Sequence, residues 1–155
     1  MCVINIQTTG LHHPRAIHIA VCTPDSVLLN TLINPRQQIE PAATRLHRHT
    51  RYTLRNAPVF GDVCPLLADT LQGRRCVTYN LPFTRHVLHH ELTRLSRHRQ
   101  FAAEWADAMP VVAHWTGLWS ARHGTYRNQR LDGPHEARSK CEALIHKLNQ
   151  LSTTG

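Results

Sequence analysis

The sequence predicts an α/β domain with a mixed sheet, because three apolar runs rich in β-branched residues come first and helical and strand-like patterns alternate after them. The first three runs span residues 2–6, 16–22 and 26–33. The tripeptide Thr-Pro-Asp at residues 23–25 separates the second run from the third, a link short enough for a hairpin. The beginning of the chain therefore predicts an antiparallel meander of three strands.

The rest of the chain carries helical periodicity interrupted by one further strand at residues 75–79. Pro41 favours the first turn of a helix, and Gly73 is a suitable stop for a helix over residues 60–72. Further helices are predicted over 84–98, from near Val111 onwards with Trp115 and Trp119, and from about Glu136 to Leu151. We expect residues 1–151 to form one domain, with 152–155 as a frayed tail and with Phe83 and Trp115 in the core.

The charge of the chain indicates a polyanionic partner. There are 18 lysines and arginines against 10 acidic residues, a formal net charge of +8, with a sequence pI near 10.0. Arginine dominates this excess, and its planar guanidinium suits phosphate and stacks on bases. Nucleic acid is therefore the first candidate partner, and a merely solvated basic surface is the alternative.

The cysteines indicate a reducing compartment. The chain has five, an odd number, and no CxxC pair, which argues against a disulfide framework and against a structural zinc site. The opening residues MCVINIQ contain no signal peptide, and no apolar run approaches the roughly 18 residues that a membrane span needs. We therefore expect a cytoplasmic protein that does not enter the membrane.

Histidine is abundant, with 13 residues, but its spacing does not predict a metal site. His86 and His90 share one face of a predicted helix, and His89 lies beside them. No cysteine or carboxylate completes a recognisable ligand set. We therefore expect no bound metal there.

Three segments, in order and spacing, resemble the motifs of the DEDDh 3′–5′ exonucleases, a superfamily that includes proofreading exonucleases and ribonuclease T-like enzymes. Residues 4–10, INIQTTG, are similar to a first motif in which Asp, any residue and Glu precede Thr-Thr-Gly. Residues 79–83, YNLPF, resemble a second motif, Tyr-Asn-x-x-Phe-Asp. Residues 134–140 resemble a third, in which Asp follows His by five positions. The resemblance implies an RNase H-like fold, a central mixed sheet of about five strands flanked by helices, with 105–109 as a further strand.

The departures from these motifs bear on activity. Where the resemblance implies four acidic residues, this chain has Asn5, Gln7, Thr84 and Lys140, whereas the motif histidine is kept as His135. Four negative charges are lost and one positive charge is gained, a change of +5. The two Mg²⁺ or Mn²⁺ ions of the family need anionic oxygen ligands. The resemblance thus implies a pseudo-exonuclease that has lost its two-metal site and has no cofactor.

The resemblance also implies where nucleic acid would bind. Thr8, Thr9, Gly10 and Leu11 lie where relatives cradle the terminal nucleotide, with backbone N–H groups toward phosphate and an apolar side chain on the base. Asn80 belongs to the second motif, and His135 and Lys140 belong to the third. Lys140 either pairs with a phosphate in the space of a lost metal or points to solvent.

A second stretch of candidate contacts follows the first predicted helix. Residues 45–55 interleave arginines, Arg48 and Arg51 among them, with His47, His49 and Tyr52. Such a mixture suits a single strand, with arginine on phosphate and rings on bases, and a solvated loop is the alternative. Basic residues at 94, 97, 98 and 99 lie at the end of the later predicted helix. There, cations interact favourably with the helix dipole, which is the preferred interpretation, and a nucleic-acid patch is the second.

Three functions remain open at this point. The first is an inactive exonuclease homologue that binds single strands or 3′ ends of DNA or RNA, in a protective or regulatory role. The second is a protein-interaction module, as a homodimer or with another protein. The third is a residual 3′–5′ exonuclease with atypical metal ligands that relies on His135. The basic excess favours the first, and the missing carboxylates weigh against the third.

Overall fold

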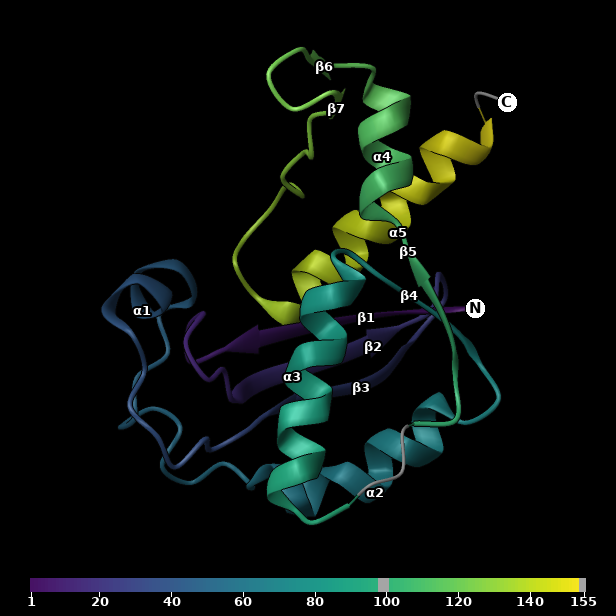
Figure 1. The fold of residues 1–155 in the computed structure, drawn as a ribbon. Helices are drawn as coiled ribbons and strands as arrows, with labels where there is room; N and C mark the ends of the chain where they lie inside the picture. The colour runs from purple at the N-terminus through teal and green to yellow at the C-terminus, as the bar shows by residue number, and fades with distance from the viewer. Residues whose placement is uncertain (98–100, 154–155) are drawn as a thin grey trace.

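The computed structural model describes residues 1–97 and 101–153, which are built around a five-stranded mixed sheet (Figure 1). The strands lie in the order β3-β2-β1-β4-β5. β1 pairs antiparallel with β2, and β2 with β3, whereas β4 lies parallel to both β1 and β5. The strand bounds are β1 (Cys2–Thr8), β2 (Ala16–Cys22), β3 (Val27–Leu32), β4 (Arg75–Thr78) and β5 (Glu104–Asp107). The predicted meander, mixed sheet and strand count are confirmed.

Helices cover both faces of this sheet (Figure 1). α2 and α3 pack on one face and α5 on the other, while α1 lies beside the end of β1. A small hairpin of β6 (Trp119–Ser120) and β7 (Thr125–Tyr126) extends beyond α4. The helix bounds are α1 (Pro41–His47), α2 (Phe60–Leu71), α3 (Leu81–Arg94), α4 (Met109–Thr116) and α5 (Ala137–Thr153).

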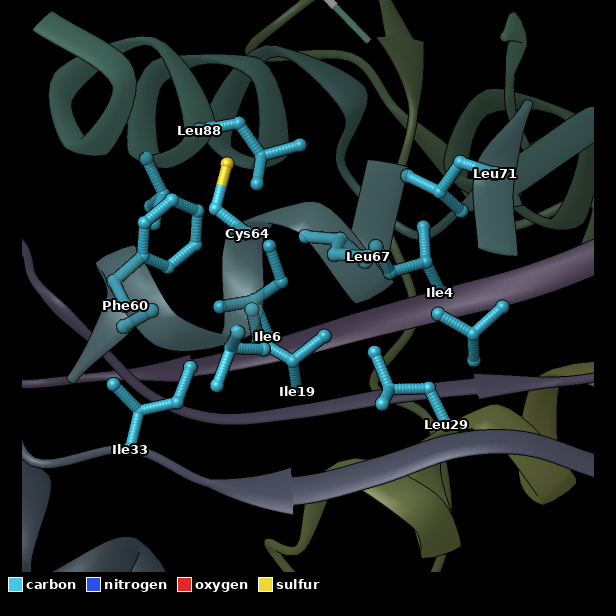
Figure 2. Packing of buried hydrophobic residues seen from close by; sticks show 14 of the residues in the cluster. Ile4, Ile6, Ile19, Leu29, Ile33, Phe60, Cys64, Leu67, Leu71 and Leu88 are labelled. Carbon is cyan, nitrogen blue, oxygen red and sulfur yellow. The ribbon is translucent and has the colours of Figure 1, made fainter. Parts of the chain in front are cut away.

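The alternation of side chains along β1 divides the core into two layers. Ile4 and Ile6 point toward α2 and α3, where α2 presents residues such as Phe60 and Leu67 (Figure 2). Val3 points to the opposite face, where α5 packs. Because successive residues of a strand point to opposite faces, Asn5 and Gln7 lie on the same side of the sheet as Val3. The register of this one strand therefore places the first-motif residues on the α5 face.

Two helices differ from their predicted bounds for local reasons. α3 begins at Leu81 rather than at residue 84, because Asn80 in the left-handed conformation (φ 76°) caps it by accepting a hydrogen bond from the Phe83 N–H at 3.2 Å. It ends at Arg94, and residue 98, the last of the predicted helix, lies outside the described residues. α4 ends at Thr116 and is capped by Gly117 (φ 73°), so that Trp119 lies in β6 instead.

Of the two aromatic residues expected in the core, Trp115 was predicted wrongly and Phe83 correctly. Trp115 is 43% exposed, because Val112 and Ala113 take the inward side of α4, whereas Phe83 does pack against the core. α5 continues through Ser152 to Thr153, so the first two residues of the expected tail lie in the helix; residues 154–155 lie outside the described residues. Within the described part of the chain, no helix is long and apolar enough to cross a membrane.

Candidate functional site

The ends of β1 and β4 bring the first two motifs together, and there the first-motif side chains are bonded to each other. The Gln7 Nε2 atom donates a hydrogen bond to Asn5 Oδ1 at 3.1 Å, so the two side-chain amides on the same strand are bonded to each other. Both side chains are only partly buried. Amide oxygens are neutral, so this pair is a much weaker ligand set for a hard divalent cation than two carboxylates are.

Thr84, the second-motif position, is directed into the protein. It is 4% exposed, and its hydroxyl lies 2.8 Å from the hydroxyl of Thr78, the last residue of β4. The same hydroxyl also lies 3.3 Å from the Asn80 carbonyl, to which it can donate. The Asn80 side-chain oxygen is occupied as the cap of α3, and its backbone N–H donates to Asp107 at 3.1 Å. These polar groups therefore connect β4, β5 and α3.

Lys140, the third-motif position, does not point to solvent, because it is only 8% exposed. Its side chain turns back onto the segment before α5, where Nζ donates to the carbonyls of Leu131, Asp132 and Gly133 at 2.7, 3.1 and 3.0 Å. An ammonium has three N–H donors, so all are used. Burial lowers the pKa of Lys140, and Asp132 partly offsets this. The residue holds the short 131–133 segment in place, which contradicts the expectation that it points to solvent, while its pairing with a phosphate stays a prediction.

The Thr-Thr-Gly turn is also satisfied internally. Thr9 and Arg15 exchange two hydrogen bonds, one from the Thr9 N–H to the Arg15 carbonyl at 2.9 Å and one from the Arg15 N–H to the Thr9 hydroxyl at 3.0 Å. The Thr8 hydroxyl donates to the Gly10 carbonyl at 2.9 Å. Among the residues predicted to cradle a nucleotide, Leu11 has an accessible side chain, which is 78% exposed beside the turn.

A carboxylate faces the end of the turn, at His12 and at Leu11, the last of the residues expected to cradle a nucleotide. Glu40, the residue before α1, accepts from the His12 N–H at 2.9 Å and lies 3.2 Å from the His12 ring. The His12 N–H is the first cause that lowers the pKa of Glu40, and the Leu11 N–H acts in the same direction. Gly10 (φ 151°) leaves room for this carboxylate, since a Cβ atom at that position would collide with it. An internal anion thus occupies the turn.

Histidines from three elements gather beside the turn. His18 on β2 pairs in register with Gln7 and is 5% exposed. Its Nε2 atom lies 2.7 Å from Asn30 Oδ1 and 3.7 Å from Glu136 Oε1, and within the described ranges its Nδ1 atom has no hydrogen-bond partner. Its ring meets His49 edge-on at 6.0 Å, and the rings of His47 and His49 are 5.5 Å apart.

His47 is held as the neutral tautomer. Its Nε2 atom donates to the Thr8 carbonyl at 3.1 Å, and its Nδ1 atom accepts from the His49 N–H at 3.1 Å. A proton on Nδ1 would remove that acceptor. Burial lowers the pKa of His47 and of His49, and neighbouring histidines add to the effect, with His135 acting on His47. His47 is buried and is therefore not open to stack on a base, contrary to the role expected for the 45–55 run.

We expect this cluster to make the fold sensitive to acid. In the unfolded chain a histidine titrates near 6.5, so below that pH the unfolded state binds protons that His47 and His49 resist in the fold. The free energy of unfolding should fall as the pH drops from 7.5 to 5.5, as measured by urea denaturation. His47→Gln should flatten this slope, whereas the exposed His123→Gln should not. An equal slope in the wild type and His47→Gln would contradict the assignment.

The remaining basic candidates are on the surface. Arg48, in the left-handed conformation (φ 65°), ends α1, and Arg51 is exposed in the turn that follows. The Arg55 guanidinium lies 3.7 Å above the ring of Tyr52, which is 71% exposed. His135 is exposed just before α5. Within the described residues, no group of three or more His, Cys, Asp or Glu side chains is arranged to hold a metal ion.

The sheet order, the two helical layers and the position of this site define the RNase H-like fold of exonucleases, and the structures that share it include DEDDh-family exonucleases. Exonuclease X in complex with 5′-overhanging duplex DNA matches with a TM-score of 0.70 at 22% identity, over 99% of this chain and 92% of that one. The nuclease domain of 3′hExo, a DEDDh family member bound to rAMP, matches with a TM-score of 0.77 at 13% identity, over 99% and 92%.

A larger exonuclease contains the same fold as one part. E. coli exonuclease I in complex with a dA16 oligonucleotide matches with a TM-score of 0.77 at 17% identity. The match covers 98% of this chain and 40% of that one. No family model matches the sequence, and no curated protein matches it. The likeness is therefore one of fold, and it confirms the RNase H-like architecture that the motifs implied.

Sequence reasoning missed several residues that shape the site. Glu40 precedes a proline at a helix start, which predicts a cap but not a contact with residues 11 and 12. His18 lies in an apolar strand, and the sequence does not predict which residues surround it in the fold. The buried pair of Arg15 and Glu91 is separated by 76 positions along the chain. The one available signal was that His18 and Glu91 are polar residues at otherwise apolar positions, since a buried polar group needs a partner.

Proposed function

We propose that this protein is an exonuclease-derived protein that binds nucleic acid, as single strands or 3′ ends, without cleaving it. The proposal that the protein does not cleave nucleic acid is supported by one observation. None of the four motif positions offers a carboxylate, and the polar atoms present there are bonded within the protein. Asn5 and Gln7 bond each other, Thr84 bonds Thr78, and Lys140 binds three carbonyls.

The donor set does not fit the two divalent metals that the fold family implies. Mg²⁺ and Mn²⁺ need anionic oxygens, and here two amides, a hydroxyl and an ammonium stand at the four positions. Without metal ligands there is no group to activate water next to His135 or to stabilise the charge that builds on a phosphate. We therefore propose that the metal site has been lost and that no cofactor is used.

Nucleic-acid binding is supported by charge and by the fold. The chain has a net charge of +8, and the exposed Arg48 and Arg51 follow α1, whose last residue, His47, bonds to the Thr8 carbonyl. Structures of the same fold were solved with duplex DNA, with an oligonucleotide and with a histone mRNA stem-loop. All five cysteines are unpaired, which supports a reducing compartment such as the cytoplasm. A protective or regulatory role would follow from binding without turnover.

The test combines binding and degradation in one experiment. Labelled single- and double-stranded oligonucleotides, carrying the label at the 5′ end so that 3′ shortening is visible, are mixed with the protein and Mg²⁺ or Mn²⁺. We expect retention that weakens as salt rises, and no shortening. Stepwise 3′ shortening that is abolished by His135→Ala would establish a residual exonuclease and overturn the proposal. Absence of any binding would overturn the proposal that the protein binds nucleic acid.

A second candidate function rests on an apolar surface near α4 and the hairpin. Val111, Leu118 and Trp119 are 55%, 53% and 54% exposed, and Trp115 lies with them on the same part of the chain. Large exposed apolar side chains are typical of protein interfaces where they form a patch. A protein partner or a homodimer through this surface is thus the alternative. It would be favoured by a stoichiometric complex in the absence of oligonucleotide binding.

Glu40 should limit affinity at the turn. Its carboxylate accepts the His12 N–H and places a negative charge where a phosphate would approach. Glu40→Gln should therefore raise the affinity for single-stranded oligonucleotides by about threefold at low salt, with the gain shrinking as salt rises. Asp25→Asn, at the opposite end of the sheet, removes one charge from an exposed turn and should have a smaller effect. Equal gains from both variants would mean that only net charge matters.

A further inference from the structure

A cavity of about 530 Å³ lies on the outer flank of α3, where the sheet ends at its edge strand β5. Trp105 pairs in register with Cys76, which belongs to the core beneath α2 and α3, so its indole lies on the α3 side of the sheet. Leu88 and Leu92 of α3 and the partly buried rings of Phe101 and Trp105 give the cavity an apolar lining. The cavity shares no residue with the site at the ends of β1 and β4.

The polar lining is mostly basic. Arg85, His86, His89 and Arg97 line the cavity together with Pro82 and Thr93, and none of the described lining residues is acidic. Arg85 and Arg97 form no ion pair with any carboxylate in residues 1–97 and 101–153, although Arg15, Arg75 and Arg138 each pair with a glutamate. Arg97 approaches the thiol of Cys64 at 3.7 Å, a weak contact. The cavity therefore presents cationic donors that lack an anionic partner.

We propose that this cavity binds a nucleoside phosphate, with the base on Trp105 and Phe101 and the phosphate on Arg85 and Arg97. Its volume falls within the usual range of small-molecule sites, roughly 300–1,000 Å³. Aromatic rings next to arginines match the two halves of a nucleotide, since rings stack on bases and guanidinium groups bind phosphate in a fork. An acidic peptide would satisfy the arginines but would leave the aromatic lining without a flat partner.

The same chemistry could come from a free nucleotide or from one nucleotide of a bound strand. This inference goes beyond the proposed function, because a free nucleotide could occupy the cavity even if the chain bound no strands. The test uses a background in which Trp115→Phe and Trp119→Phe leave Trp105 as the only tryptophan of the three. Both replaced residues are exposed, so the fold should tolerate the changes. AMP, a dA4 oligonucleotide and a glutamate tetrapeptide are then titrated while Trp105 fluorescence is followed.

We expect saturable quenching by AMP or by dA4, weakened about tenfold in Arg85→Ala/Arg97→Ala. Arg94→Ala is the matched control, since Arg94 is on the same helix but outside the cavity. Quenching by both ligands would identify a site for free nucleotides, and quenching by dA4 alone would identify a site for a strand. No quenching, equal quenching by the peptide, or equal weakening by Arg94→Ala would overturn the proposal. Strand binding elsewhere, seen by retention without quenching, would leave the proposed function intact.

Discussion

Glu91→Ala is expected to lower the free energy of unfolding by about 3–5 kcal/mol, the cost of leaving a buried charge without its partner. Glu91 on α3 is 1% exposed, and its Oε1 atom accepts from the Arg15 guanidinium at 2.8 Å and from the Ala16 N–H at 2.9 Å. The Arg15 side chain is itself only 11% exposed. Removing the carboxylate would therefore leave both a guanidinium and a backbone N–H buried without an acceptor.

An exposed glutamate pair on the same protein serves as the control. Glu104 lies 3.7 Å from Arg75, and both side chains are more than half exposed, at 73% and 62%. Such surface pairs contribute about 0–1 kcal/mol, so Glu104→Ala should change the urea midpoint little. Glu91→Gln keeps an acceptor for the Ala16 N–H and should fall between the two. If Glu91→Ala cost no more than Glu104→Ala, the buried pair would not be what secures this part of the fold.

The same pair connects stability to the candidate site. The Arg15 main chain also exchanges two hydrogen bonds with the N–H and the hydroxyl of Thr9, so α3 fixes Arg15 and Arg15 fixes the Thr-Thr-Gly turn. A mild variant such as Glu91→Gln should then weaken oligonucleotide retention at the turn before it unfolds the protein. The reason is that the turn would lose its anchor while the sheet remains paired.

Lys140→Met is expected to lower the free energy of unfolding by about 1–3 kcal/mol and to leave oligonucleotide affinity nearly unchanged. The ammonium holds three carbonyls of residues 131–133, and methionine keeps the apolar stem but offers no donor. The lower end of the range allows for water to reach the exposed carbonyls of Asp132 and Gly133. Stability is measured by urea denaturation, and affinity is measured at a temperature where the variant is folded.

The chain supplies a matched control because its other lysine, Lys147, is on the same helix. Lys147 lies over the Trp115 ring at 5.6 Å, a contact that contributes about 0.5–1 kcal/mol at a surface. Lys147→Met removes the same charge and should cost less stability. A selective loss of affinity in Lys140→Met, with no loss of stability, would restore the idea that Lys140 binds phosphate and contradict the structural role.

What the sequence determined by itself was the pattern of elements and the chemistry of the motif positions. The apolar, β-branched runs at 2–6 and 16–22 and the helical spacing over 60–72 are local properties, so the sheet, its meander and its covering helices could be predicted. The absence of carboxylates at Asn5, Gln7, Thr84 and Lys140 is a matter of residue identity.

The tertiary structure alone decided which groups these polar side chains meet. Glu40 faces the His12 N–H across 28 positions and Glu91 meets Arg15 across 76, and such contacts leave no periodic trace in the sequence. Lys140 could be placed at a lost metal ligand from the motif, yet the fold of the short 131–133 segment turned its ammonium to three carbonyls. The physical reason is that a buried donor must find an acceptor wherever the packed chain provides one, and packing is set by the whole fold.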